Sequence, residues 1–450
     1  MSNELKPLHF DADYTMEEAL AEAKRCLNCP RPLCQMGCPI ENEIPRFIQA
    51  IAHGNFGLAN DILAERTNLP SICGRVCPRE NQCEGNCIMN KAKKPPINIG
   101  KLERFAADFE SINELRKPKK IQQNLGNVAV VGSGPAGLSV AGDMAKLGYK
   151  VTVFEGQSEP GGVLLFGIPE FRLSKSVVRR EIARLEGLGV KFVCNIFIGQ
   201  DKTLDDLFAE GFDSIFIGTG THIPQEVRME NDEVHGVFQA MYLLTNVQLV
   251  ENGDLDESLI PVRKGDRVVI IGGGNVAMDA ARTCVRLGCE SVTVAYRRSQ
   301  EQMPALLSEY EEARAEGVQF QWFASPVAVE GKDKVEGFKY EVMALNEDGA
   351  GIHGTGNYQV MPVDKIIIAA GHKPNARLIG EGNNLQVDEK GYIITAEDPY
   401  GMTNRKGVFA GGDVVHKPAT VVLAMREAKK AVDGMVKYME IKKAQDSITQ

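Results

Sequence analysis

The sequence predicts an α/β protein in which a small helical domain rich in cysteine is followed by two Rossmann-like domains. Eight of the eleven cysteines lie between residues 26 and 87. Two later segments each contain an apolar strand, a glycine-rich turn, a helix and a second apolar strand, which is the pattern of a dinucleotide-binding unit. With 450 residues, 43% apolar and 25% charged, the chain fits about three globular domains.

Composition and targeting signals narrow the classes of function. The N-terminal residues 1–26 lack the basic and apolar regions of a signal peptide, and no later segment approaches about 18 consecutive apolar residues. We therefore expect a cytoplasmic protein with no membrane insertion. The net charge of -9 argues against nucleic acid as a partner.

The cysteines form two groups, "CLNCPRPLCQMGCP" at 26–39 and "CGRVCPRENQCEGNC" at 73–87. Three interpretations compete: two 4Fe-4S clusters, two structural zinc sites, or disulfides. A reducing cytoplasm disfavours disulfides. Zinc sites favour paired knuckles in turn-rich and strand-rich surroundings, whereas both groups here carry a Cys-Pro pair, which is typical of ferredoxin-like runs. The spacing favours two 4Fe-4S clusters held by all eight cysteines, Cys73 included.

The surroundings of the cysteines are expected to be helical. A capping box at Thr15–Glu18 begins one helix, and the segment 44–69 repeats apolar residues at helical spacing, which predicts a helical pair between the two groups. Apolar residues recur at helical spacing at Ala19, Leu20, Ala23 and Leu27, so Cys26 is expected to end this helix. The two cysteine groups should therefore fold back together.

The first dinucleotide unit is "NVAVVGSGPAGLSVAGDMAKLGYKVTVFEGQ", which begins at residue 127. Its glycines permit close approach of a pyrophosphate to the helix N-terminus, and an acid about twenty residues on can bind a ribose. The residues expected to bind this dinucleotide are Gly132, Gly134, Pro135, Ala136, Gly137 and Glu155.

The second unit, "DRVVIIGGGNVAMDAARTCVRLGCESVTVAYRRS", ends in arginines where the first ends in a glutamate. Two guanidinium groups can bind a 2′-phosphate, which a carboxylate would repel. This site should therefore take NADP(H), and two dinucleotide folds imply that the first site holds a flavin, FAD. The residues expected at the NADP(H) site are Gly272, Gly274, Asn275, Val276, Ala277, Arg297, Arg298 and Gly371.

Two matching strands, in "DSIFIGTGTHIP" and "DKIIIAAGHKPN", indicate where the chain leaves one domain and returns, so the NADP(H) domain is inserted into the FAD domain. The expected domains are 1–120 for the iron-sulfur part, 126–224 with 373–450 for FAD, and 225–372 for NADP(H). Near the end, "AGGD" and a helix from about Ala419 should face the flavin. The remaining residues expected to bind FAD are Gly162, Gly220, Gly412, Asp413 and Thr420.

Taken together, the cysteine pattern, "PPINIGKLERF", "GSGPAG", "GIPEFRL", "GGGNVAMD", "YRR", "MPA" and "AGGD" resemble the small-subunit family of NADPH-dependent glutamate synthase over essentially the whole chain. That family includes the NADP-binding large subunit of electron-bifurcating NADH-dependent ferredoxin:NADP transhydrogenases. The resemblance implies two 4Fe-4S clusters and replaces Cys73 by Glu103. The implied ligand sets are Cys26, Cys29, Cys34 and Cys87 for one cluster, and Cys38, Cys77, Cys83 and Glu103 for the other.

The expected activity is hydride transfer between NADP(H) and FAD, followed by one-electron transfer through the clusters to or from a partner protein. Because the flavin and nicotinamide need positioning more than acid–base chemistry, we expect no catalytic side chain. The remaining cysteines, Cys194, Cys284 and Cys289, contain no C-x-x-C pair and are expected to be buried thiols.

Three functional roles fit this activity. The chain length and the stretch "EQMPALLSEYEEARAEGV" favour the bifurcating transhydrogenase, whose partner would be a flavin or iron-sulfur protein handling NAD(H) and ferredoxin. The small subunit of glutamate synthase, with a large synthase subunit as partner, is the alternative. A stand-alone NADPH reductase of a small molecule is the third.

Overall fold

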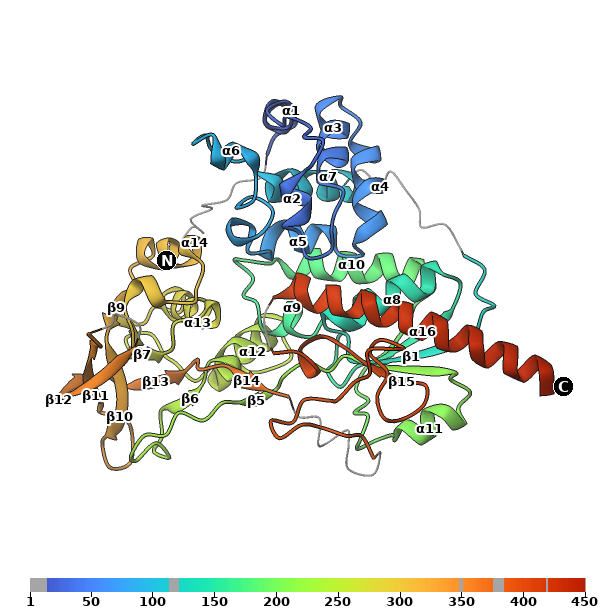
Figure 1. Cartoon of the computed structure of the whole chain (residues 1–450). Helices are drawn as coiled ribbons and strands as arrows, with labels where there is room; N and C mark the ends of the chain where they lie inside the picture. Colours follow the sequence, from blue (N-terminus) through green and yellow to red (C-terminus); the bar gives the residue numbers. More distant parts are fainter. Residues whose placement is uncertain (1–13, 113–120, 348–350, 375–383, 418–419, 450) are drawn as a thin grey trace. The chain divides into compact units, whose positions relative to one another are not determined.

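The computed structural model describes residues 14–112, 121–347, 351–374, 384–417 and 420–449 (Figure 1). The chain divides into two compact units. The larger unit contains the described residues of Asp11–Leu165, Arg172–Ile223 and Lys373–Gln450, and the smaller unit contains Phe166–Phe171 and Pro224–His372.

The first part of the larger unit is helical, as the sequence predicts. Its elements are α1 (Met16–Lys24), α2 (Leu33–Met36), α3 (Ile44–Ala52), α4 (Phe56–Arg66), α5 (Pro70–Val76), η1 (Arg79–Asn81), α6 (Ile88–Lys91) and α7 (Ile99–Ile112). The capping box of α1 is present, because Thr15 and Glu18 exchange hydrogen bonds. The helical pair between the cysteine groups is confirmed as α3 and α4, whose apolar residues join α7 in one core.

One residue of the first helix departs from the predicted pattern. The helix ends at Lys24, with Arg25 as its C-cap, so Leu27 lies beyond it and is 64% exposed. The helix therefore ends slightly before Cys26, the predicted end, and the chain leaves it in time to bring Cys26 and Cys29 to the same pocket.

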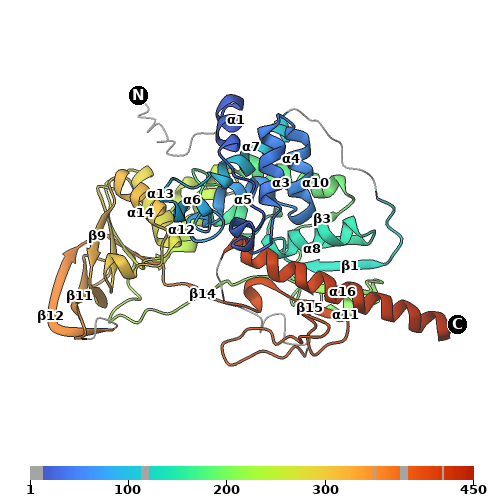
Figure 2. The ribbon, with the colours of Figure 1, turned by 45° about the horizontal axis from the view of Figure 1, so that its top comes forward.

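The second part of the larger unit is a Rossmann-like sheet with strand order β15-β4-β1-β2-β3, paired in parallel throughout. Its strands are β1 (Asn127–Val131), β2 (Lys150–Phe154), β3 (Lys191–Val193), β4 (Ser214–Ile217) and β15 (Val408–Ala410), and its helices include α8 (Pro135–Lys146), α10 (Lys175–Gly187), α11 (Leu204–Ala209) and α16 (Val421–Thr449). Runs of Val, Ile and Phe in the strands are buried, as expected for a sheet covered on both faces. Helices α8 and α16 lie side by side (Figures 1 and 2).

The smaller unit contains a second parallel sheet, of order β6-β13-β7-β8-β9, and an antiparallel sheet, β10-β11-β12. Its elements are β6 (Val237–Gln239), α12 (Ala240–Glu251), η2 (Glu257–Leu259), β7 (Arg267–Ile271), α13 (Asn275–Arg286), β8 (Ser291–Tyr296), η3 (Gln300–Gln302), α14 (Leu307–Ala315), β9 (Gln319–Trp322), β10 (Ala324–Glu330), β11 (Gly337–Leu345), β12 (Ile352–Pro362) and β13 (Lys365–Ile368). The short pair β5 (Ile223–Pro224) and β14 (His372–Lys373) occurs where the chain passes between the units, and α9 (Val163–Phe166) precedes the segment Phe166–Phe171. The described helices include none long and apolar enough to cross a membrane.

Within the larger unit, polar contacts join the helical part to the first sheet domain. Asn68 donates to Asp143 Oδ1 at 2.7 Å and to the Ser139 carbonyl at 3.2 Å, both on α8. Asp108 of α7 pairs with Arg75 at 2.5 Å and with Arg180 of α10 at 2.6 Å. These part-buried contacts fix the cysteine-rich helices on the domain that carries the first glycine turn.

Candidate functional site

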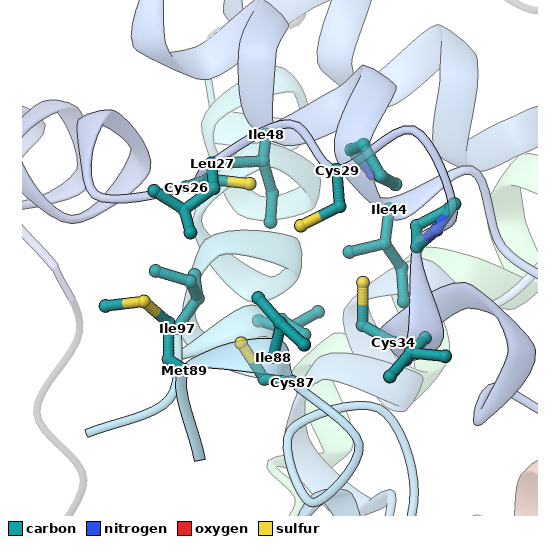
Figure 3. A pocket seen from close by; sticks show the side chains of 14 residues that line it. Cys26, Leu27, Cys29, Cys34, Ile44, Ile48, Cys87, Ile88, Met89 and Ile97 are labelled. Atoms are coloured by element: carbon teal, nitrogen blue, oxygen red, sulfur yellow. The ribbon is translucent and has the colours of Figure 1, made fainter. Parts of the chain in front are cut away.

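Four cysteines from both cysteine groups line one pocket (Figure 3). They are Cys26, Cys29, Cys34 and Cys87, the set that the resemblance assigns to one cluster, and their sulfur atoms point into the pocket. The other lining side chains are apolar. Burial raises the pKa of the Cys34 thiol to about 11, so thiolates here need neighbouring positive charge, which iron would supply. The residues present therefore fit an iron-sulfur cluster.

A second pocket contains five possible donors for four ligand positions. They are Cys38, Cys73, Cys77, Cys83 and Glu103. Burial raises the pKa of the Cys38 thiol to about 11, and the pKa of Cys83 also rises because of burial. The pocket thus has the donor chemistry of a second cluster, with one donor in excess.

Glu103 is the unusual donor of the second pocket. It is 8% exposed, and burial raises its pKa to about 8 against the opposing effect of Arg79. Asn42 donates to Glu103 Oε1 at 3.3 Å, while Asn42 Oδ1, also buried, has no hydrogen-bond partner among the described residues. Asn42 therefore holds a carboxyl group whose charged form is disfavoured by burial and favoured by a nearby cation.

Cys73 competes with Glu103 for the fourth position. It is 2% exposed, and its thiol lies 3.8 Å from Met425 Sδ on α16 and 3.8 Å from Thr67 Oγ1. A hydrogen bond with Cys73 is the main cause of the raised pKa of Cys77. Both candidates face the same pocket, and the ligand role of Glu103 stays a prediction.

The two pockets share part of their walls. Ile44 of α3 and Ile99 of α7 line both, and Val422, in the first turn of α16, lines the second. The two donor sets are therefore separated by a thin apolar layer, and the second donor set adjoins the helix that follows the Gly412-Asp413 motif.

The first glycine turn connects β1 to α8, as predicted. Gly132 has a φ of +93°, and a Cβ added to Gly137 would lie 1.9 Å from the Gly132 carbonyl oxygen. A Cβ on Gly134 would meet nothing within 4 Å. The turn thus requires glycine for its own packing at Gly137 and leaves open space at Gly134, where a pyrophosphate could approach the backbone.

Glu155 follows β2, but its carboxylate already has partners in the chain. The backbone N–H and hydroxyl of Ser133 donate to Glu155 Oε2 at 2.9 and 2.5 Å, and the N–H of Gln157 donates to Oε1 at 2.9 Å. These bonds hold the carboxylate at the glycine turn. A carboxylate has about four acceptor positions, so capacity remains for a ribose hydroxyl.

Two of the other five residues predicted to bind FAD, Gly162 and Gly412, pack against the same turn. A Cβ on Gly162 would be 2.9 Å from Gly134 Cα, and one on Gly412 would be 2.8 Å from Ala136 Cβ. Asp413 lies in η4 (Gly412–Val414). Gly220 follows β4 and adopts a φ of +71°. Thr420 accepts a hydrogen bond from Leu423 N–H at 3.3 Å at the start of α16; that helix begins at Val421, and Ala419 lies outside the described residues.

The second glycine turn connects β7 to α13 and repeats this geometry. Gly272 has a φ of +143°, and its added Cβ would lie 2.4 Å from the Ala369 carbonyl oxygen, whereas Gly274 again faces open space. The predicted residues Asn275, Val276 and Ala277 form the first turn of α13, and Gly371 follows β13 with a φ of +98°.

Arg297 and Arg298 directly follow β8, and both are exposed. Within the described part of the chain neither guanidinium has an ion-pair or hydrogen-bond partner. Charged groups held at a strand end without internal partners are available to a ligand, so the geometry is compatible with binding of a 2′-phosphate.

Sequence reasoning missed a loop that contacts the second glycine turn. Ala305 N–H donates to the Gly273 carbonyl at 2.9 Å, and Leu306 N–H donates to Asn275 Oδ1 at 2.9 Å. Asn275 therefore has a structural partner in addition to any nucleotide. The motif "MPA", which contains Pro304 and Ala305, marked this loop in the sequence. The contact could not be predicted from it, because the sequence does not show which turn the loop reaches.

Helix α14, which follows this loop, is fixed to α13 by a buried ion-pair network. Arg282 is 3% exposed and pairs with Glu312 at 2.5 Å and with Glu316 at 2.7 Å. Glu309 lies 3.6 Å from the same guanidinium. The stretch "EQMPALLSEYEEARAEGV" thus supports the nucleotide-binding fold of its own unit.

The prediction for the other three cysteines is correct for one of them. Cys284 is buried in α13, whereas Cys194 and Cys289 are partly exposed. Cys289 lies shortly after α13, and Cys194 directly follows β3, so both lie just beyond the ends of elements and are less enclosed than Cys284 within its helix.

Two family models match the chain. Residues 6–115 match the dihydropyrimidine dehydrogenase domain II, 4Fe-4S cluster, family, and residues 126–428 match the pyridine nucleotide-disulphide oxidoreductase family. Solved structures with a similar fold include Mycobacterium tuberculosis FprA in complex with NADPH, at 20% identity and a TM-score of 0.58 over 71% of this chain and 86% of that one. Lactococcus lactis thioredoxin reductase is also similar, at 23% identity and a TM-score of 0.53 over 70% and 99%. The chain is an NADPH-dependent flavin oxidoreductase with a 4Fe-4S domain.

Relatives matched over nearly the whole chain identify its family. The glutamate synthase [NADPH] small chain of Halomonas elongata is 37% identical over 95% of this chain and 92% of that protein, and that of Escherichia coli is 36% identical over 94% and 92%. The Escherichia coli NAD-dependent dihydropyrimidine dehydrogenase subunit PreT is 34% identical over 95% and 96%. This chain belongs to the glutamate synthase small-subunit family of FAD and iron-sulfur NADPH oxidoreductases.

Proposed function

We propose that the chain oxidises NADPH and delivers the electrons to a larger partner subunit, as the small chain of an NADPH-dependent glutamate synthase. The observation that carries the proposal is the continuity of sites within the larger unit. The first glycine turn, the Gly412-Asp413 motif, the second donor pocket and the first donor pocket follow one another, joined by Val422 and then by the shared wall of Ile44 and Ile99.

The proposed assignment keeps the domains expected from the sequence. Residues 1–120 carry two 4Fe-4S clusters, residues 126–224 with 373–450 bind FAD, and residues 225–372 bind NADP(H). The proposed ligands are Cys26, Cys29, Cys34 and Cys87 for one cluster and Cys38, Cys77, Cys83 and Glu103 for the other.

The side chains of this chain bind and position. Bound FAD would take a hydride from NADPH and pass its electrons on singly to the clusters. Arg297 and Arg298 hold the 2′-phosphate, Glu155 holds the ribose of FAD, and the loop at Ala305 keeps the second glycine turn in place. No side chain acts as an acid or base in this scheme.

The partner subunit could belong to either of two enzymes, a glutamate synthase or a bifurcating transhydrogenase. Similarity to glutamate synthase small chains from three bacteria favours a glutamate synthase. A bifurcating NADH-dependent ferredoxin:NADP transhydrogenase is the other assembly that the sequence resembles. The stretch that favoured it forms α14 and the loop before it, and its contacts lie within the nucleotide-binding unit, so it gives no reason to prefer that partner.

Reconstitution tests the proposal. Purified anaerobically, the chain should contain FAD and about eight irons, and with the glutamate synthase large subunit of the same organism it should support glutamate formation from glutamine and 2-oxoglutarate with oxidation of NADPH. Oxidation of NADPH coupled to reduction of both NAD⁺ and oxidised ferredoxin with flavin-containing partners, and no glutamate, would instead favour the transhydrogenase. Two zincs and negligible iron would contradict both.

The fourth ligand of the second cluster requires its own test. If Glu103 is the ligand, Cys73→Ala retains eight irons, whereas Glu103→Ala loses or destabilises one cluster. Glu103→Cys should keep the iron and change the electron paramagnetic resonance spectrum, because thiolate replaces carboxylate. Iron loss in Cys73→Ala, together with full iron in Glu103→Ala, would assign the position to Cys73.

A further inference from the structure

The surface around the first donor pocket carries a concentration of positive charge. The segments 24–36 and 85–95 contain six Lys and Arg residues and no Asp or Glu, in a chain whose net charge is -9. The six residues are Lys24, Arg25, Arg31, Lys91, Lys93 and Lys94. We call these two segments the basic face.

The two segments lie against each other. Arg25 Nη2 donates to the Pro95 carbonyl at 2.7 Å, and Cys26 and Cys87 line the same pocket. Arg25 is neutralised by Glu22, at 2.7 Å. The other five basic residues are exposed, and within the part of the chain that the structure describes none of them forms an ion pair. Five charges of one sign therefore face solvent.

The centre of the basic face is apolar. Leu27 is 64% exposed and lines the pocket beside Cys26, and Met36, in the same helix as Cys34, is 74% exposed. An apolar centre with a charged rim is the usual arrangement of a protein–protein interface, where the rim sets orientation and association rate. Here that arrangement lies directly over the cysteine site that is farther from α16.

We propose that the basic face binds an acidic surface of the redox partner, with Leu27 and Met36 at the centre of the contact, so that electrons leave through the site of Cys26, Cys29, Cys34 and Cys87. The inference rests on the proposed function and adds the docking surface and the charge of the partner. The charge of the basic face favours an acidic partner surface, which is attracted and steered, over a second copy of this chain docking through the same face, which would present the same five positive charges and be repelled.

Two small haem proteins of opposite charge serve as probes: cytochrome b5, which is acidic, and cytochrome c, which is basic. The test variant is Lys91→Glu/Lys93→Glu/Lys94→Glu. The control reverses three exposed lysines outside the basic face, Lys150, Lys191 and Lys443, and so changes the net charge equally. At low ionic strength the test variant should reduce cytochrome b5 about tenfold more slowly than the wild type with NADPH, and cytochrome c faster, whereas the control should stay within about twofold.

The effect should vanish near 1 M salt, where the Debye length is about 3 Å. Met36→Gln should weaken cytochrome b5 binding at every salt concentration, because Met36 lies outside the lining of the pocket and its loss removes apolar contact without disturbing the cysteines. Iron content and NADPH-dependent flavin reduction should be unchanged in both variants.

Equal effects of the test and control variants would overturn the proposal, as would a cytochrome b5 rate that does not respond to either. Calorimetric binding of cytochrome b5 to the three proteins tests the face without electron flow. A wild type that binds and reduces cytochrome b5 through the basic face but supports no glutamate formation with the large subunit would refute the proposed function and leave the docking surface standing.

Discussion

Removing the two guanidinium groups after β8 should abolish the preference for NADPH over NADH. The variant Arg297→Ala/Arg298→Ala changes two exposed side chains that have no ion-pair or hydrogen-bond partner among the described residues. Substitutions of this kind usually alter the free energy of unfolding by less than about 0.5 kcal/mol. Any large effect on nucleotide binding would therefore come from lost contact with the ligand.

The size of the effect follows from the exposure of these arginines. A hydrogen bond to a charged group contributes about 1.5 to 3 kcal/mol, and solvent at an exposed strand end favours the lower value. Losing one such bond from each arginine should weaken NADPH binding by about 3 kcal/mol, roughly a hundredfold in dissociation constant. NADH has no 2′-phosphate, so its affinity should change by less than about threefold.

The assay is a calorimetric titration of the oxidised protein with NADP⁺ and with NAD⁺, each at two salt concentrations. Arg228→Ala is the matched control, because Arg228 is 92% exposed on the same unit and is assigned no role in binding. The loss for NADP⁺ should shrink as salt rises. Equal losses for both nucleotides, or an equal loss in Arg228→Ala, would refute the reasoning.

Three further predictions concern the other sites. Cys29→Ala should lower the iron content by about one cluster and slow electron transfer to a protein acceptor, while stopped-flow reduction of FAD by NADPH continues at the wild-type rate; loss of that reduction would mean that the cysteine site supports the flavin domain. Gly137→Val should give protein without FAD, judged by absorbance near 450 nm, because an added Cβ would lie 1.9 Å from the Gly132 carbonyl oxygen; full flavin content would contradict the turn geometry. The hydrogen bonds of Arg267 lower the pKa of Asp364 to about 2, so this pair stabilises the folded state above the unfolded pKa of about 3.9 and the stabilisation is lost as pH falls from about 4 to 2. Asp364→Asn should therefore flatten the pH dependence of unfolding in that range, and an unchanged slope would show that solvent screens the pair.

Local sequence was sufficient for the parallel sheets and both glycine turns. The strands are continuous apolar runs, and Gly137 and Gly272 stand where the backbone of a neighbouring segment leaves no room for a side chain. Local sequence was not sufficient to group Cys26 with Cys87. These residues are 61 positions apart and come together by the packing of α3, α4 and α7, so only the resemblance to the family predicted that they share a cluster.

Features that depend on tertiary contacts were less accessible. Helical periodicity that included Leu27 predicted a helix ending at Cys26, yet the helix ends at Lys24 and leaves Leu27 at the surface. The spacing of the cysteines predicted Cys73 as a ligand. In the structure both Cys73 and Glu103 line the second pocket and both are buried, so their positions do not decide which of them is the ligand. The contact of Ala305 with Gly273 depends on how α14 packs on α13, which periodicity alone does not specify.

The wall formed by Ile44 and Ile99 couples the two cysteine sites, although neither residue is a candidate ligand. Both side chains are 2% exposed and line both pockets, so they set how much water reaches either one. Solvent exposure is one of the factors that determine cluster reduction potentials. A smaller residue at either position would hydrate both sites at once, and evolution could therefore adjust the two potentials together through a hydrocarbon side chain that never touches iron.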